Sequence, residues 1–233
     1  MAGRLVLIRH GDEPLDDRVH SFAVSRGFEP AVVRPFAGER LGELDHGVAG
    51  SVIYGGMFEA YETEKYPFLK DEARWIEACM KRGIPVLGIC QGAQQIAHVL
   101  GAPVGPPPGG EHEFGYYALY PTEAGREILP EPIRVTQSHF HTFGIPHGGV
   151  RLASSDLFEN QAFSYGEKTY AFQFHAEVTA AGFRRTQERS TMFGKPGAQT
   201  REEQDRLMPL HDAVQEKWFL AFLDRFFGGT VSV

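Results

Sequence analysis

A continuous apolar run at residues 84–89 stops at a cysteine set between two glycines, and helical spacing follows. Residues 84–100 read Ile-Pro-Val-Leu-Gly-Ile-Cys-Gln-Gly-Ala-Gln-Gln-Ile-Ala-His-Val-Leu. This pattern predicts a buried strand, a sharp turn and a helix. Flanking glycines permit a strained backbone and let a substrate approach closely. The segment therefore predicts a strained and exposed Cys90 above the carboxyl end of a sheet.

The predicted turn also gives Cys90 a chemical setting. The free N–H groups and the positive dipole end of the following helix would favour a nucleophilic thiolate. The N–H of Gln91 would point the same way, toward the place of an oxyanion. The alternative is that Cys90 is a buried apolar residue without chemistry, as most free cysteines are.

Length and composition indicate one globular α/β domain spanning residues 1–233. Hydrophobic residues make up 42% of the chain and charged residues 23%, with no low-complexity tract. The net charge is −7 and no cluster of Lys and Arg stands out, which argues against a nucleic-acid partner. We therefore expect a small-molecule substrate or another protein as the partner.

The same sequence predicts a cytoplasmic protein that does not enter a membrane. No apolar segment approaches membrane-spanning length, and the run at residues 5–8 is too short for a signal sequence. The two cysteines, Cys79 and Cys90, offer no disulfide framework, and a working thiol needs a reducing compartment.

Strands and helices alternate along the first half of the chain, which predicts a mostly parallel, doubly wound sheet flanked by helices. A small antiparallel β meander is expected near the end of the second half. The expected strands are residues 4–8, 30–34, 51–54, 84–89, 113–120 and 133–138, and the meander residues 151–154, 162–165 and 169–174. The expected helices are residues 16–27, 71–82, the segment after Cys90, and 215–227, with Cys79 serving packing within the second.

Two other expected strands are followed by residues that could bind a ligand or react. Gly55 and Gly56 follow the strand at residues 51–54, where paired glycines let backbone N–H groups face a ligand. The residues Leu-Ile-Arg-His-Gly at 7–11 resemble the histidine phosphatase signature, in which His10 would be phosphorylated. No later stretch repeats that family's pattern, so this activity stays a remote alternative and His10 is expected to be a loop residue.

A cysteine nucleophile needs a base, and the base needs a group that orients it. His175 and Glu177, at the end of an aromatic stretch, fit these two roles. Residues two apart in a strand point to the same face, so we expect the carboxylate to reach the imidazole along a strand. Taken alone, the alternative for such a pair is a surface contact at a strand end.

These segments together resemble the class I, triad-type glutamine amidotransferases. The resemblance rests on Gly-Ile-Cys-Gln-Gly-Ala-Gln at 88–94 and on Gln-Phe-His-Ala-Glu-Val at 173–178. It extends to Val-Ile-Tyr-Gly-Gly at 52–56 and Gln-Ser-His at 137–139, and the segments at 152–155 and 159–163 resemble stand-alone members. It implies a flavodoxin-like fold and release of ammonia from a γ-carboxamide through a γ-glutamyl thioester.

The resemblance also implies a role for each matching position. Cys90 would be the nucleophile, His175 the general acid and base, and Glu177 its orienting carboxylate. The N–H groups of Gly56 and Gln91 would form the oxyanion hole. The substrate would be held by Gln94 and by the backbone of Ser138 and His139.

Two positions depart from the family pattern, and one question stays open. Ala176 stands where the family has a proline, which loosens that corner, and Gln91 replaces an aromatic residue or leucine. The residues after 177 are too few for another catalytic domain. Either a separate synthase subunit receives the ammonia, or the chain acts alone as a γ-glutamyl hydrolase or peptidase. Nothing in the sequence requires a metal or another cofactor, since the ten histidines are scattered.

Overall fold

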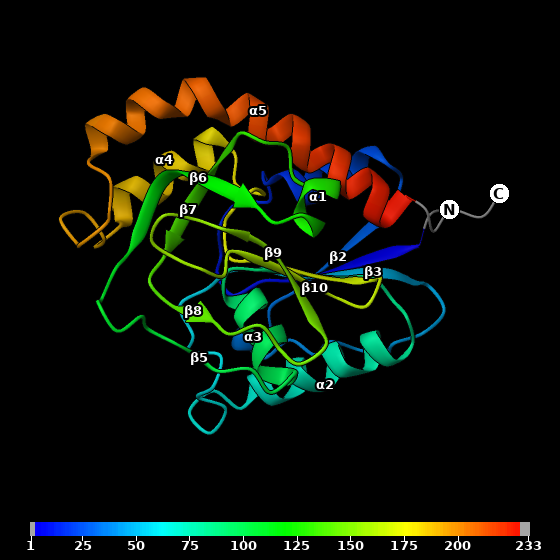
Figure 1. Cartoon of the computed structure of the whole chain (residues 1–233). Coiled ribbons are helices and arrows are strands. Elements are labelled where there is room, and N and C mark those ends of the chain that lie inside the picture. Colours follow the sequence, from blue (N-terminus) through cyan, green and yellow to red (C-terminus); the bar gives the residue numbers. More distant parts are fainter. Residues whose placement is uncertain (1–2, 229–233) are drawn as a thin grey trace.

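The centre of the fold is a nine-stranded mixed sheet with helices on both faces (Figure 1). The structure is a computed structural model that describes residues 3–228. The strands are β1 (Arg4–Ile8), β2 (Glu29–Val33), β3 (Val48–Ile53), β4 (Val86–Ile89), β5 (Val104–Gly105), β6 (Glu113–Pro121), β7 (Ile133–His139), β8 (Thr142–Phe143), β9 (Gly149–Ser154), β10 (Ala162–Tyr165) and β11 (Thr169–Phe172). The helices are α1 (Arg18–Ser25), α2 (Phe68–Lys81), α3 (Gln91–Val99), α4 (Ala180–Arg189) and α5 (Arg201–Gly228), with short 3-10 helices at Pro35–Ala37 and Ala124–Glu127.

The sheet has the order β2-β1-β3-β4-β11-β10-β9-β6-β7, which confirms the predicted fold class. Strands β2, β1, β3, β4 and β11 are parallel, and β10, β9, β6 and β7 extend them in antiparallel fashion. The short strands β5 and β8 form a separate ribbon. Every residue of β4 is buried, as the apolar run in the sequence requires of a central parallel strand.

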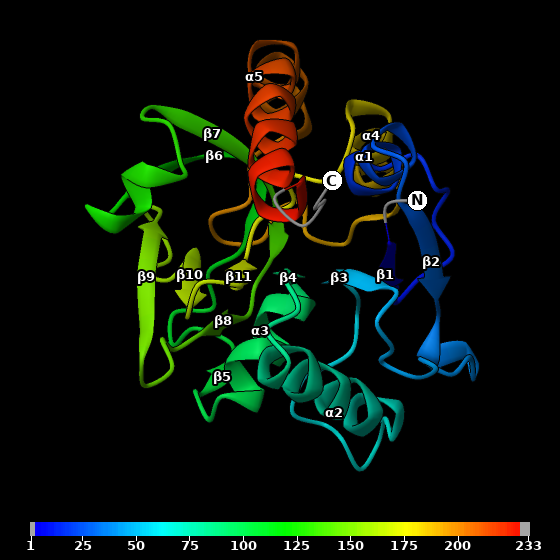
Figure 2. The same cartoon turned by 90° about the vertical axis from the view of Figure 1, so that its right-hand side faces the viewer.

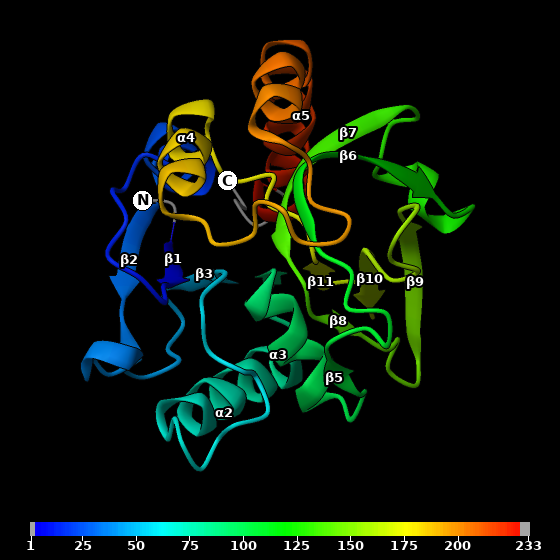
Figure 3. The same ribbon diagram turned by 90° about the vertical axis from the view of Figure 1, so that its left-hand side faces the viewer.

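Helices cover the two faces of the sheet in separate groups. Helices α1, α4 and α5 lie on one face and α2 and α3 on the other (Figures 2 and 3). Strands β6 and β7 curve away from the parallel strands and lie beside α5. The alternation along β1 shows how two cores arise, because Leu5 and Leu7 pack toward α5, whereas Val6 and Ile8 pack toward α2 and α3.

The C-terminal helix is longer than the sequence pattern predicted. It begins at Arg201 rather than at residue 215 and continues through Pro209, a residue that usually ends a helix. Leu207 and Met208 are buried in a small core with Phe114, and this packing supports the polar first half of the helix.

Within residues 3–228, no helix is both long and apolar enough to cross a membrane.

Helix α4 was not predicted, because its sequence offers little apolar periodicity. Only Phe183 and Gln187 in this helix are buried. Its start is instead fixed locally, since the Thr179 side chain accepts a hydrogen bond from the Gly182 N–H.

The packing role predicted for Cys79 in α2 is confirmed, because the residue is fully buried and burial raises the pKa of its thiol to about 12.

The aromatic residues of α5 should contribute much of the stability of the fold. Phe219 is fully buried between α5 and the sheet. We expect Phe219→Ala to lower the free energy of unfolding by about 3–5 kcal/mol, because the substitution leaves a cavity. Urea unfolding followed by circular dichroism measures this loss. Val24→Ala, at an exposed position of α1, is the control and should change stability by less than about 0.5 kcal/mol; equal losses would contradict the core assignment.

Candidate active site

Cys90 occupies the turn between β4 and α3 in a strained conformation. Its backbone has φ 52° and ψ −109°, and among residues 3–228 it is the sole non-glycine residue with positive φ. The Cys90 N–H donates to the carbonyl of Phe172 over 2.8 Å, and its carbonyl accepts from the Gln94 N–H over 3.1 Å. The positive φ confirms the strain predicted for Cys90, and these bonds to β11 and α3 hold the strained backbone in place.

The exposure expected for Cys90 was wrong. The residue is 6% exposed. Cys90 instead borders a cavity of about 250 Å³, together with Ser138, His175 and Glu177.

His175 and Glu177 meet, although the predicted strand geometry was wrong. Strand β11 ends at Phe172, and the two residues lie in the turn that follows. The imidazole Nδ1 and Glu177 Oε1 are 2.8 Å apart, so Nδ1–H donates to the carboxylate. A carboxylate in this place fixes the tautomer that leaves Nε2 free for a reactant.

Gly55 brings Cys90 and His175 together. A Cβ atom on Gly55 would lie 2.8 Å from Cε1 of His175 and 3.3 Å from Cβ of Cys90. Both side chains therefore border the same glycine, and a larger residue would collide with the imidazole. The absence of a side chain at this position lets the strand end run directly past the reacting groups.

The neighbouring Glu177 and Cys90 change the pKa of the His175 imidazole. Burial disfavours the charged imidazolium, but the Glu177 carboxylate and the Cys90 sulfur favour it more strongly. Together they raise the pKa of His175 well above its ordinary value. This setting favours the protonated imidazolium of His175.

Gly56 also lies in close contact with its surroundings. A Cβ here would lie 2.4 Å from Cβ of His10 and 2.6 Å from Oε1 of Gln91. The same Oε1 accepts from the Phe58 N–H over 2.9 Å and so holds the turn after β3 against the start of α3. In the described part of the chain, the N–H groups of Gly56 and Gln91 have no hydrogen-bond acceptor. Two N–H groups without an acceptor could serve an oxyanion hole, and this role of Gly56 and Gln91 stays a prediction.

His10 is hydrogen-bonded to the backbone at the start of this turn. Its Nδ1 donates to the carbonyl of Tyr54 over 3.1 Å, and its Nε2 lies 3.0 Å from a carboxylate oxygen of Glu72. The His10 and Glu72 side chains are fully buried, and Gln95 donates to the same carboxylate. Both ring nitrogens of His10 are thus occupied, and the geometry gives the histidine phosphatase alternative no support.

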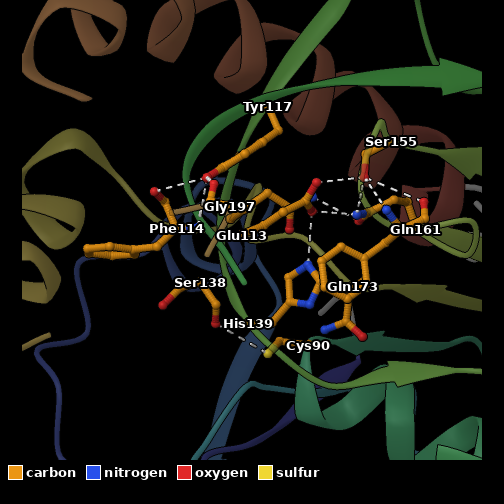
Figure 4. A network of polar contacts seen from close by, with 12 residues as sticks. Cys90, Glu113, Phe114, Tyr117, Ser138, His139, Ser155, Gln161, Gln173 and Gly197 are labelled. Atoms are coloured by element: carbon orange, nitrogen blue, oxygen red, sulfur yellow. Dashed lines mark hydrogen bonds and ion pairs between the residues drawn. The ribbon is translucent and has the colours of Figure 1, made fainter. Parts of the chain in front are cut away.

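The three residues expected to hold the substrate lie in different settings. Ser138 borders the cavity, and its carbonyl oxygen is 4.0 Å from the Cys90 sulfur (Figure 4). Gln94 is buried and donates its side-chain amide to Gln173 over 3.1 Å. The His139 side chain is also buried and points to Glu113, not to the Cys90 sulfur (Figure 4). Their role in substrate binding stays a prediction.

A buried network around Glu113 was missed in the sequence. Its carboxylate accepts from Ser155 and Gln161 over 2.6 Å each and lies 3.1 Å from Nε2 of His139 (Figure 4). Nδ1 of His139 donates to the carbonyl of His141 over 2.9 Å. The sequence signal that could have indicated this network is Glu113 itself, a charged residue at the first position of a mostly apolar strand. The network fixes the end of β7, where Ser138 faces Cys90.

No arrangement suited to a metal ion is found in residues 3–228, where His, Cys, Asp and Glu side chains form no group of three or more that could hold one.

The fold and the site define a doubly wound α/β protein with a Cys-His-Glu cluster at the carboxyl ends of its parallel strands. The family model for glutamine amidotransferase class-I matches residues 16–190. The chain belongs to the class I glutamine amidotransferase family.

Relatives and solved structures agree with this assignment. A glutamine amidotransferase-like protein of Salmonella typhimurium, YfeJ, is 32% identical over 68% of this chain and 69% of its own length. A glutamine-hydrolysing GMP synthase of Porphyromonas gingivalis is 32% identical over 60% of this chain, which spans 27% of that enzyme. The crystal structure of a glutamine amidotransferase from Thermotoga maritima has a TM-score of 0.84 at 31% identity and covers 97% of this chain and 99% of that one.

The contact between His175 and Glu177 predicts a measurable pH dependence. We expect NMR titration of the His175 ring to give a pKa above about 6.5, and Glu177→Gln to lower it, because the favourable charge is removed. Because the folded-state pKa exceeds the unfolded one, the stabilisation is full below about pH 6.5 and is lost as the pH rises through the folded-state value. A His175 pKa that Glu177→Gln leaves unchanged would contradict the pairing.

Proposed function

We propose that the chain hydrolyses the γ-carboxamide of glutamine by cysteine-based catalysis. The observation that carries this proposal is the strained Cys90 at the start of α3, which shares one cavity with His175 and Glu177. Membership in a family of glutamine amidotransferases supports glutamine as the substrate, and the relative from Porphyromonas gingivalis is named as glutamine-hydrolysing.

The first half of the proposed reaction forms a thioester. The Cys90 thiolate attacks the γ-carbonyl carbon, and the carbonyl oxygen becomes an oxyanion that the N–H groups of Gly56 and Gln91 stabilise. The His175 imidazolium then gives its proton to the leaving nitrogen. The C–N bond breaks, ammonia departs, and a γ-glutamyl group remains on the sulfur.

The second half restores the enzyme. His175, now neutral, takes a proton from water as the water oxygen attacks the thioester carbon. The same two N–H groups stabilise the second oxyanion, and its collapse releases glutamate and the Cys90 thiolate. Glu177 holds the imidazole by its Nδ1–H throughout and stabilises the imidazolium whenever it forms.

A second candidate is hydrolysis of a γ-glutamyl amide whose leaving group is larger than ammonia. The cavity continues beyond Cys90 to charged residues, among them Glu13 and the ion pair of Asp16 and Arg185 at 2.6 Å. These groups offer both signs of charge to an amine that carries a carboxylate. In this case the chain acts alone as a γ-glutamyl peptidase, whereas ammonia released from glutamine would serve a separate synthase subunit.

Ammonia release from glutamine tests the proposal. We expect Cys90→Ala to lower the rate at least about 10³-fold, because the nucleophile is removed. Cys79→Ala is the matched control: this fully buried thiol packs in α2, so its loss should leave the rate within about twofold of wild type. Turnover that survives in Cys90→Ala would refute the mechanism.

The same comparison of wild type with Cys90→Ala on γ-glutamyl dipeptides, with detection of the released amino acid in place of ammonia, separates the two candidates. Cysteine-dependent turnover of glutamine supports the amidotransferase function and directs a search to a synthase subunit. Cysteine-dependent turnover of the dipeptides alone supports the peptidase function.

A further inference from the structure

Helix α5 makes two polar links to the turn that carries His175 and Glu177, and the proposed mechanism uses neither of them. The helix spans Arg201–Gly228 and so lies outside residues 16–190, which the family model matches. Figures 2 and 3 show it beside α1 and β7, the two elements through which the links run.

The first link runs through Arg18 at the start of α1. Its side chain is 2% exposed, and Nη1 donates to the carbonyls of Ala176, over 3.1 Å, and Val178. The Arg18 backbone N–H donates to the carbonyl of Glu177 over 2.8 Å. One residue therefore binds three consecutive carbonyls of the turn. These three hydrogen bonds restrict the backbone of the turn at Ala176, which lacks the fixed φ of a proline.

Asp212 of α5 holds Arg18 in this position. Nη2 of Arg18 donates to Oδ1 of Asp212 over 2.8 Å, while Glu216 is 3.9 Å away and half exposed. A buried guanidinium requires an anionic partner, because burial of an unpaired charge is costly. Loss of the Asp212 charge should therefore loosen Arg18 and, through it, the turn.

The second link runs through Thr136 of β7. Gln215 is fully buried; its Oε1 accepts from the Thr136 N–H over 2.6 Å, and its Nε2 donates to Oγ1 of Thr136 over 3.1 Å. The carbonyl of Thr136 accepts from the backbone N–H of His175 over 2.8 Å. Gln215 thus fixes the backbone group to which His175 is bound.

We propose that Asp212 and Gln215 are positioning residues for His175, which act through Arg18 and Thr136. The proposal rests on the function of His175 as acid and base given above. The two links reach the turn at different points, one at the carbonyls of residues 176–178 and one at the His175 N–H. Helix α5 is in this view a part of the catalytic apparatus that contributes no group to the cavity.

The test compares Asp212→Asn and Gln215→Met with Asp224→Asn. Asp224 is a matched control, because it forms the exposed ion pair with Arg26 that also joins α5 to α1, at 2.6 Å. On the γ-glutamyl substrate that wild type turns over, we expect kcat to fall about tenfold or more in the first two variants with little change in KM, since small displacements of a catalytic group are costly. The control should keep kcat within about twofold.

A readout independent of turnover is the NMR titration of the His175 ring. Asp212→Asn and Gln215→Met should change the apparent pKa of the His175 ring, and Asp224→Asn should not. If wild type turns over no γ-glutamyl substrate, the proposed function fails, and the ring titration still decides the positioning. Should Gln215→Met not fold, as judged by circular dichroism, Asp212→Asn decides alone. Unchanged kcat and ring titration in folded Asp212→Asn would overturn the proposal, as would equal effects in Asp224→Asn.

Discussion

The hydrogen bonding of β4 to β3 on one side and β11 on the other is the interaction on which the rest of the site depends. Because the three strands are parallel, their carboxyl ends meet at one edge of the sheet. Gly55 and Gly56 follow β3, Cys90 follows β4, and His175 follows β11 by a short turn. Residues far apart in the chain thus become neighbours through strand pairing alone, and a shift in register would separate them.

Two buried pairs of histidine and glutamate support the surroundings of the site. His10 and Glu72 lie below the turn after β3, and His139 and Glu113 lie at the end of β7, with atoms 3.0 and 3.1 Å apart. The pair of His175 with Glu177 differs from these two, because it is partly open to the cavity and lies next to Cys90. The two buried pairs therefore act as internal supports, since buried polar groups need hydrogen-bond partners, whereas the His175 side chain borders the cavity.

Local patterns in the sequence predicted the parallel fold and the strained turn at Cys90, because strand, glycine and helix signals all lie within a short segment. They gave a wrong strand geometry for His175 and Glu177, since the aromatic stretch continues past the end of β11 at Phe172. Supports such as Glu72, Arg18 and Gln215 could not be predicted. Each resembles a surface residue of a helix, and its partner lies 62, 158 or 79 residues away.

The covalent intermediate offers the most direct test of the central claim that Cys90 is the nucleophile of a γ-glutamyl transfer. The measurement is mass spectrometry of the acid-quenched chain after brief mixing with glutamine, followed by peptide mapping. The account predicts a mass increase of one γ-glutamyl group on the peptide that contains Cys90, and none on the peptide that contains Cys79. A γ-glutamyl group found on any other residue during turnover would contradict it.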